Sequence, residues 1–114
     1  MTILADEAVR VYVREISSIP PLSPEEEDEC VAHVRARDGL AESAAKRLIE
    51  ANLPLVVFIA ERYRNDRSHI LNLIQRGNEG LLRAVQTLPD SSPDTFATHA
   101  TSHIERAIGS SISD

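Results

Sequence analysis

Two histidines come closest, by type and spacing, to forming a metal site. His99 and His103 stand four residues apart, so on a helix they would share one face, and paired imidazoles can ligate zinc. The sequence fixes no third ligand and contains no HExxH pattern. We therefore expect no metal and no cofactor, and we interpret the histidines as a solvent-facing pair that gains charge below neutral pH.

Cys30 is the other reactive side chain, and the only cysteine. A cysteine becomes a strong nucleophile when a neighbouring cation or a helix N-terminus lowers its pKa, and neither is evident beside Cys30. We expect a small buried hydrophobe in a reducing cytoplasm, where disulfides are rare. No glycine-rich phosphate loop follows a strand, so the sequence indicates neither an enzyme nor a small-molecule substrate.

The stretch 75–80, QRGNEG, carries polar groups suited to recognition, yet it is an unusual sequence for a helix. Its two glycines and asparagine cost roughly 2 kcal/mol of helix propensity in total, compared with alanine. Something other than local helix stability must favour them. Close packing and a partner surface are the two candidates.

A helical hairpin would position this stretch. Apolar residues recur at three- and four-residue steps from Leu48 to Tyr63, and again from Ile70 to Leu88 after a polar break at 65–68. Two such stripes joined by a turn must bury their inner faces against each other. We expect one long helix from Leu40 to about Arg64, kinked at Pro54. A second helix should run from about Ser68 to Leu88.

Shorter helices should flank the hairpin. The run from Asp6 to Ile16 is amphipathic, and Ser23-Pro24-Glu25-Glu26 is a strong helix-start signal. Ser92-Pro93 should start a last helix in the same manner. The apolar stripe of that helix consists of Phe96, Ala100, Ile104 and Ile108. The sequence thus predicts an all-α, compact bundle of about five helices around a central hairpin. We expect one domain, 1–114, with upstream helices at 6–39, the hairpin at 40–89 and the last helix at 92–112.

Composition and charge agree with this fold class. At 114 residues, with 42% apolar and 26% charged residues, the chain is one ordinary globular domain. Aromatic residues are only 4%, so the core must be aliphatic. No apolar run approaches the ~20 residues of a membrane span, and no export leader is recognisable, so we expect a cytoplasmic protein. The net charge of −6 disfavours non-specific adhesion to nucleic acid.

Several motifs together resemble a known family. ANLPLVVFIAERY followed by LIQRGNEGLLRAV resembles the second conserved region of primary-type bacterial RNA polymerase sigma factors, of the sigma-70 family. VRVYVREI with PLSPEEE resembles the region just upstream, and FATHATSHIERAI falls where the family has its DNA-melting helix. The resemblance covers about residues 6–114 and implies a role in bacterial transcription initiation.

The resemblance also implies a partner, the RNA polymerase core. In the family, the hairpin docks on the helical clamp of the β′ subunit, and glycines such as Gly77 and Gly80 would let that partner approach closely. Asn72 stands where the family usually has aspartate, and Arg76 where it usually has glutamate, so a surface suited to basic groups would be weakened or retargeted. The family's contact positions fall here on Leu53, Val56, Asn72, Gln75, Asn78 and Leu82, with Arg76 beside them. For Leu53, Val56 and Leu82, simple core packing is the alternative.

Promoter melting, by contrast, looks impaired. The family stacks tyrosines and tryptophans on unpaired bases, but those positions hold Asp94, His99, Ser102 and His103 here, and Phe96 belongs to the apolar stripe. Residues 90–114 carry one basic and four acidic residues, a net charge of −3 that should repel DNA. The weak candidates for contact with promoter DNA are Arg10, Arg14 and Arg106. A solvated face paired with neighbouring acids is the alternative for the first two.

Two functions follow from these observations. The first is a sigma-factor-like initiation domain that binds RNA polymerase core through residues 46–88, with promoter melting impaired. The alternative is a degenerate sigma-like interaction module, a regulator or competitor of sigma factors that does not read DNA. Self-association through the same apolar ridge is a third, weaker hypothesis.

Overall fold

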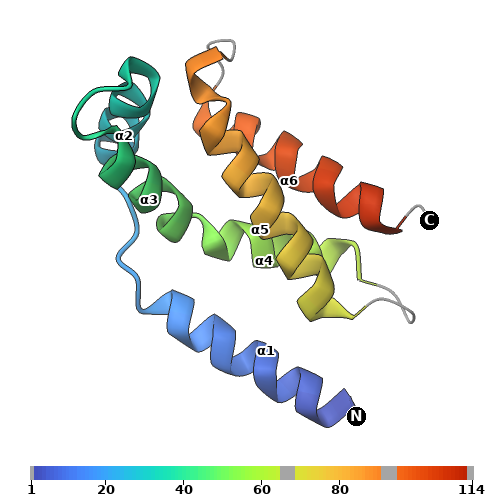
Figure 1. Cartoon of the computed structure of the whole chain (residues 1–114). Coiled ribbons are helices and arrows are strands. Elements are labelled where there is room, and N and C mark those ends of the chain that lie inside the picture. The colour runs from blue at the N-terminus through green and yellow to red at the C-terminus, as the bar shows by residue number, and fades with distance from the viewer. Residues whose placement is uncertain (1, 65–68, 91–94, 113–114) are drawn as a thin grey trace.

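The computed structural model (Figure 1) describes residues 2–64, 69–90 and 95–112, with side chains from residue 7 onward. Within these ranges the secondary structure is helical throughout, so the predicted all-α bundle around a central hairpin is confirmed. The expected caps Ser68, Ser92 and Pro93 lie outside the described residues. The elements are α1 (Thr2–Ser17), α2 (Pro24–Ala36), α3 (Ala41–Ala51), α4 (Leu53–Arg62), α5 (Ile70–Gln86), the 3-10 turn η1 (Leu88–Asp90) and α6 (Phe96–Ile112).

The first arm of the hairpin differs from the prediction. The prediction of a single kinked helix over 40–64 was wrong, because this segment forms two helices, α3 and α4, that are separated at Asn52. Pro54 has no N–H to donate and its ring clashes with the preceding turn, so α3 cannot continue through it. Pro54 instead lies in the first turn of α4, where a missing amide costs nothing. The Asn52 side chain stabilises the break by donating from Nδ2 to the Leu48 carbonyl, 2.8 Å away.

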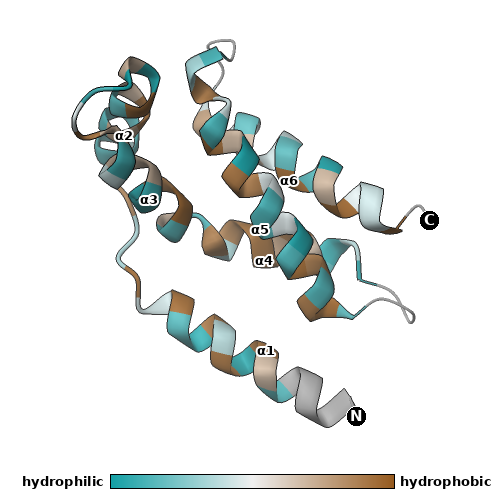
Figure 2. Ribbon diagram, in the orientation of Figure 1, coloured by the Kyte–Doolittle hydropathy of each residue, from teal (hydrophilic) through white to brown (hydrophobic). Residues whose placement is uncertain are grey.

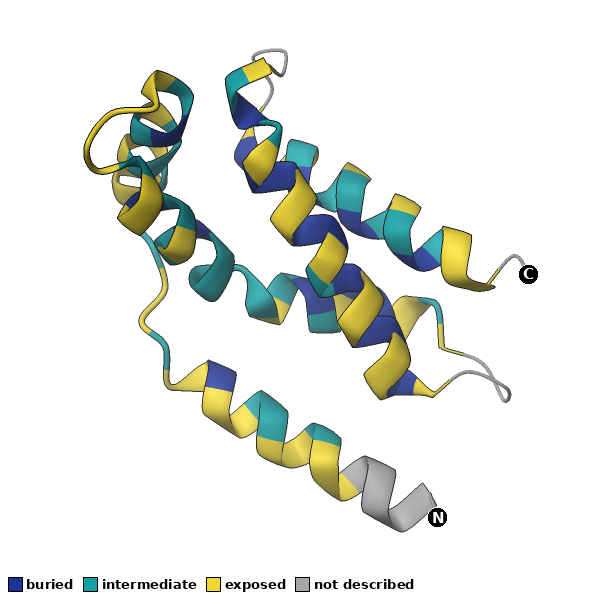
Figure 3. Ribbon diagram, viewed as in Figure 1, coloured by how far each residue is buried: buried dark blue, intermediate teal, exposed yellow. Residues whose placement is uncertain are grey.

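Helix α5 forms the centre of the bundle and packs against every helix except α2 (Figure 1). Figures 2 and 3 show its apolar and buried residues on the side that faces α4 and α6. The predicted stripes of α5 and α6 are confirmed as core, whereas the first stripe, from Leu48 to Tyr63, is buried only in part. The core residues of α5 and η1 are Ile70, Leu73, Ile74, Leu81, Val85 and Leu88. Those of α6 are Phe96, Ala100, Ile104 and Ile108, and all ten side chains are at most 5% exposed.

The two glycines of α5 are explained by close packing between helices. Both are buried, and they face the core rather than a partner, which corrects the expectation that they would let a partner approach. A Cβ on Gly80 would lie 2.5 Å from the His103 carbonyl oxygen of α6, and one on Gly77 would lie 2.6 Å from Cγ1 of Val56. These glycines therefore allow α5 to approach the backbone of α6 and the side chains of α4.

Helix α2 begins as predicted. Ser23 Oγ accepts from the Glu26 N–H at 3.1 Å, and Glu26 Oε1 accepts from the Ser23 N–H at 2.9 Å, which completes a capping box. The helix ends before Arg37, which takes the left-handed conformation with φ 51°, rather than near Gly39 as expected.

Helix α1 begins at Thr2, four residues before the predicted start, and lies along one side of the bundle. It packs on α4 and α5, and its Val9 and Tyr12 contact the core. Ile16, near its end, is also buried. The residues between these on its outer side are exposed, as the amphipathic pattern predicts. None of the helices in the described ranges is long and apolar enough to cross a membrane.

Candidate partner-binding face

The side of α5 that points away from the core is a continuous exposed surface (Figure 3). Because the buried residues occupy one side of the helix, the positions on the opposite side, about half a turn away, remain in solvent. We refer to this surface as the α5 face. Its exposed members are Leu71, Asn72, Gln75, Arg76, Glu79, Leu82, Arg83 and Gln86.

Two leucines give the α5 face its apolar character. Leu71 is 36% exposed and Leu82 is 45% exposed, and Gln75 lies between them on the same helix. An uncharged amide between apolar side chains can donate and accept hydrogen bonds while the leucines are buried against a partner. Sequence reasoning missed Leu71, because it lies out of phase with the apolar stripe. An apolar residue outside the stripe of a predicted helix is expected to point away from the core, so its position could have identified Leu71 as an outward-facing leucine.

Arg76, the departure with the largest change of charge, has an intramolecular partner. Its Nη1 lies 3.1 Å from Glu79 Oε1, one turn further along the α5 face. The two side chains are 56% and 60% exposed, so the pair contributes little to stability, ~0–1 kcal/mol. The pair does, however, offset the positive charge that arginine brings to this position.

Three of the expected contact residues are less accessible than the rest. Val56 is fully buried at 0% exposure, and Leu53 is half-buried against the core. Asn78 is also half-buried, because its Nδ2 donates to the Tyr12 hydroxyl of α1 at 3.2 Å. Its Oδ1 is buried and has no hydrogen-bond partner among the described residues. Of the predicted contact residues, the structure brings Asn72, Gln75, Arg76 and Leu82 together on one open surface.

The three arginines expected near DNA are exposed but are not brought together. Arg10 and Arg14 lie on the outer side of α1, whereas Arg106 lies on α6. Helices α1 and α6 lie on different sides of α4 and α5 (Figure 1). These residues therefore do not form one continuous basic surface.

The two histidines are not the solvent-facing pair that the spacing suggested. Both are half-buried in the seam between α5 and α6, with ring centroids 4.7 Å apart. His99 Nε2 donates to the Ala84 carbonyl at 2.8 Å, which ties the start of α6 to the end of α5. Burial, then His99, Arg106 and Arg83 in that order, lowers the pKa of His103. No group of three or more potential metal ligands occurs within the described residues.

The outer side of α6 carries no aromatic ring. Phe96 is 5% exposed and belongs to the core, as predicted, while Ser102 is exposed and Asp94 lies outside the described residues. The side chains on this outer side are Ala97, Thr98, Thr101, Ser102 and Glu105. This surface has small polar groups and one carboxylate, and no π-face.

Cys30 is half-buried, and desolvation by that burial raises the pKa of its thiol. A raised pKa keeps the thiol protonated and unreactive near neutral pH, which agrees with its interpretation as a packing residue.

Comparison of the sequence with known proteins finds relatives. Residues 48–114 match the family model described as Sigma-70 region 2, and residues 7–39 match Sigma-70 factor, region 1.2. The chain is 44% identical over 112 residues to the RNA polymerase sigma factor SigA of Clostridium acetobutylicum, covering 98% of this chain and 29% of that protein. It is 41% identical over 109 residues to SigA of Lactococcus lactis subsp. cremoris, covering 96% and 30%. The chain thus spans less than a third of the length of these relatives.

Proposed function

The chain belongs to the sigma-70 family, and on that premise we propose that it is a transcription-initiation domain that binds the core of RNA polymerase through the α5 face. The docking surface would be the clamp helices of the β′ subunit, and the site of action the cytoplasm. The hairpin region 40–89 would carry the interaction, while α1 and α2 support it.

The observation that carries this proposal is the pair of exposed leucines around Gln75. Leu71 and Leu82 leave apolar surface in water, and fully burying a leucine contributes ~1.5–3 kcal/mol. Being about half exposed, each would contribute about 1 kcal/mol on docking. Amide hydrogen bonds from Asn72 and Gln75 would then fix the register of a partner helix. Val56 would not contact the partner. It would support the α5 face from the core side, where α4 packs against Gly77.

We further propose that Arg76 adapts the interface to its own host's polymerase rather than abolishing binding. Arg76 and Arg83 outnumber the single glutamate on the α5 face, Glu79. A partner that presents a carboxylate near Arg76 would be favoured, and one that presents only basic groups would be disfavoured. Arg76→Glu should therefore weaken binding to the host's β′ clamp helices and strengthen binding to clamp helices whose facing groups are basic.

The test is binding of the chain to the isolated β′ clamp helices of its own host, measured by calorimetry. Leu82→Ser should weaken binding about tenfold, because it removes a central apolar contact. Leu40→Ser is the matched control, since Leu40 is also exposed, at 57%, but lies between α2 and α3. That substitution should leave the affinity unchanged.

Equal effects of the two serine substitutions would place the contact elsewhere on the molecule. No binding of the parent chain at high micromolar concentration would reject the polymerase proposal itself. Sedimentation of the chain alone would show whether self-association competes for the same leucines.

The absence of aromatic rings on the outer side of α6 favours a second candidate. In this one the domain binds polymerase or a regulator but does not melt promoter DNA. Fluorescence anisotropy with matched single- and double-stranded oligonucleotides separates the two candidates, because a melting domain prefers unpaired bases on which aromatic rings can stack. We expect no preference for the single strand, and a clear preference would argue against impaired melting.

A further inference from the structure

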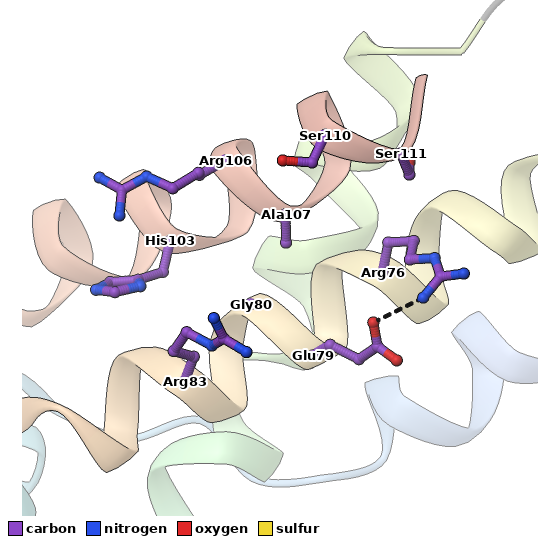
Figure 4. Close-up of a pocket in the computed structure, with 9 residues that line it drawn as sticks. All are labelled: Arg76, Glu79, Gly80, Arg83, His103, Arg106, Ala107, Ser110 and Ser111. Carbon is purple, nitrogen blue, oxygen red and sulfur yellow. Dashed lines mark hydrogen bonds and ion pairs between the residues drawn. The ribbon is translucent and has the colours of Figure 1, made fainter. Parts of the chain in front are cut away.

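A groove of about 480 Å³ runs between α5 and α6, outside the buried seam (Figure 4). Its walls carry Arg76, Glu79 and Arg83 from α5, and His103, Arg106 and Ser111 from α6. Three arginines gather here although the chain as a whole has a net charge of −6. The groove is therefore a local basic site on an acidic protein.

The charges in this groove are not internally balanced. Glu79 is the only acid among the described residues that line it, and the carboxylate is already paired with Arg76 at 3.1 Å. Arg83 and Arg106 have no ion pair within the part of the chain that the structure describes. Both lie close enough to His103 for their charges to disfavour its protonation. Two guanidinium groups and an imidazole thus line the same groove within electrostatic range of His103, and the carboxylate of Glu79 is already paired.

The walls that carry these groups are fixed. Gly80 brings the backbones of α5 and α6 so close that an added Cβ would lie 2.9 Å from the Ile104 Cα. Arg83 lies one turn beyond this contact on α5, and Arg106 follows Ile104 on α6. Because the helices cannot slide apart without losing core packing, the bases of the two arginine side chains keep a constant separation. A ligand between them would meet partly preorganised donors.

We propose that this groove binds a phosphate-type dianion, held by Arg83 on α5 and Arg106 on α6, with His103 as a further donor when it is protonated. A guanidinium presents a planar fork of N–H groups that matches two oxygens of a phosphate. Two such forks from facing walls suit a tetrahedral dianion, whereas one carboxylate would neutralise only one of them. The inference does not depend on polymerase binding.

The phosphate could belong to a small phosphorylated compound or to a nucleic acid backbone. The surroundings favour the compact ligand. Outside the groove, the outer side of α6 presents the carboxylate of Glu105, which would repel a long polyanion that extends across this helix. The test below distinguishes the two sources.

The experiment is calorimetric titration of the chain with inorganic phosphate, with sodium chloride adjusted to hold the ionic strength constant. We expect saturable binding with one site. Arg83→Gln and Arg106→Gln should each weaken it about tenfold or more, the fold-change expected for loss of a charge-assisted hydrogen bond. Arg62→Gln is the matched control, because Arg62 is an exposed arginine of α4 outside the groove, and it should have no effect.

Binding that does not saturate, or that falls equally in all three variants, would overturn the proposal. Circular dichroism would establish that each variant remains folded. A short DNA duplex of arbitrary sequence then serves as competitor. Displacement of bound phosphate by the duplex would assign the site to a nucleic acid backbone, and saturable phosphate binding without displacement would assign it to a small ligand.

Sulfate provides an independent readout, since it remains a dianion through the range in which His103 titrates. The groups that face His103 are Arg83 from α5, and His99 and Arg106 from α6. Sulfate affinity should rise as the pH falls from neutral, because the bound dianion favours the imidazolium. His103→Gln should remove that rise, and an affinity independent of pH in the parent chain would exclude His103 as a donor.

Discussion

Replacing Gly80 by alanine tests the packing of the two central helices. The added Cβ would lie 2.5 Å from the His103 carbonyl oxygen, 2.9 Å from the Ala107 Cβ and 2.9 Å from the Ile104 Cα. Two of these three obstacles are backbone atoms, so no side-chain rotation relieves the clash. Helices α5 and α6 would have to separate by about 1 Å to restore ordinary van der Waals contact.

The size of the effect follows from two opposing contributions. Overpacking of a well-packed core costs typically ~1–3 kcal/mol, and the backbone obstacles put Gly80 toward the upper end. Alanine is the better helix former by ~1 kcal/mol, which offsets part of that cost. We expect Gly80→Ala to lower the free energy of unfolding by about 1–2 kcal/mol. At about 4 °C per kcal/mol, the fall in Tm would be about 4–8 °C.

Urea unfolding followed by circular dichroism measures this quantity, and an unchanged slope would show that the extent of unfolding is the same. Gly109→Ala is the matched control, because Gly109 also lies within a helix, α6, but has nothing within 4 Å of an added Cβ. That variant should gain about 0.5–1 kcal/mol from helix propensity alone. A Gly80→Ala protein as stable as the Gly109→Ala protein would refute the close approach of α5 and α6.

Four further predictions concern the rest of the bundle. Gly77→Ala should destabilise the chain, since its Cβ would lie 2.6 Å from Val56 Cγ1, and the loss should be smaller in a Val56→Ala background, as a double-mutant cycle by urea unfolding would measure. Ser23→Ala should lower stability by about 1 kcal/mol through loss of the helix cap, measured in the same way. The hydrogen bond from the Ser23 backbone N–H lowers the pKa of Glu26. The ionised Glu26 carboxylate therefore stabilises the fold above the ordinary carboxyl pKa, and this stabilisation is lost as the pH falls through the lowered pKa. Glu26→Gln should make the decline of Tm at acid pH less steep. Burial lowers the pKa of His103, so the stability of the fold should fall as the pH drops below the ordinary pKa of histidine. A His103→Gln variant whose Tm declines with pH as steeply as that of the parent chain would contradict this prediction.

The features predicted correctly from the sequence are those that depend on short-range rules. The stripe Phe96, Ala100, Ile104 and Ile108 is a repeat of four residues, and the Ser23 capping box is a local motif, so each could be predicted without knowledge of the fold. The break at Asn52 was mispredicted because the apolar pattern stays in phase across Pro54, although the backbone does not.

The features that could not be predicted depend on which helices meet. The stretch QRGNEG alone does not indicate that Gly77 faces α4 and Gly80 faces α6. A glycine that allows close helix packing and a glycine that gives access to a partner look the same in a sequence. The burial of Asn78 beneath Tyr12 is likewise a contact between residues 66 positions apart. The groove between α5 and α6 depends on the same pairing, and its arginines are 23 residues apart in the sequence.

The weak attachment of α1 has a consequence for hydrogen exchange. This helix reaches α2 through an extended connector and is fixed by few side chains, with only Ile16 fully buried among those described. A unit with so little buried surface opens at a lower free energy than the global unfolding transition, so its amides should exchange before those of α5 and α6. Each opening would break the hydrogen bond that Asn78 Nδ2 donates to Tyr12. It would also release an amide whose Oδ1 has no partner among the described residues in the closed form. The docking equilibrium of α1 would then set how often Asn78 joins the α5 face.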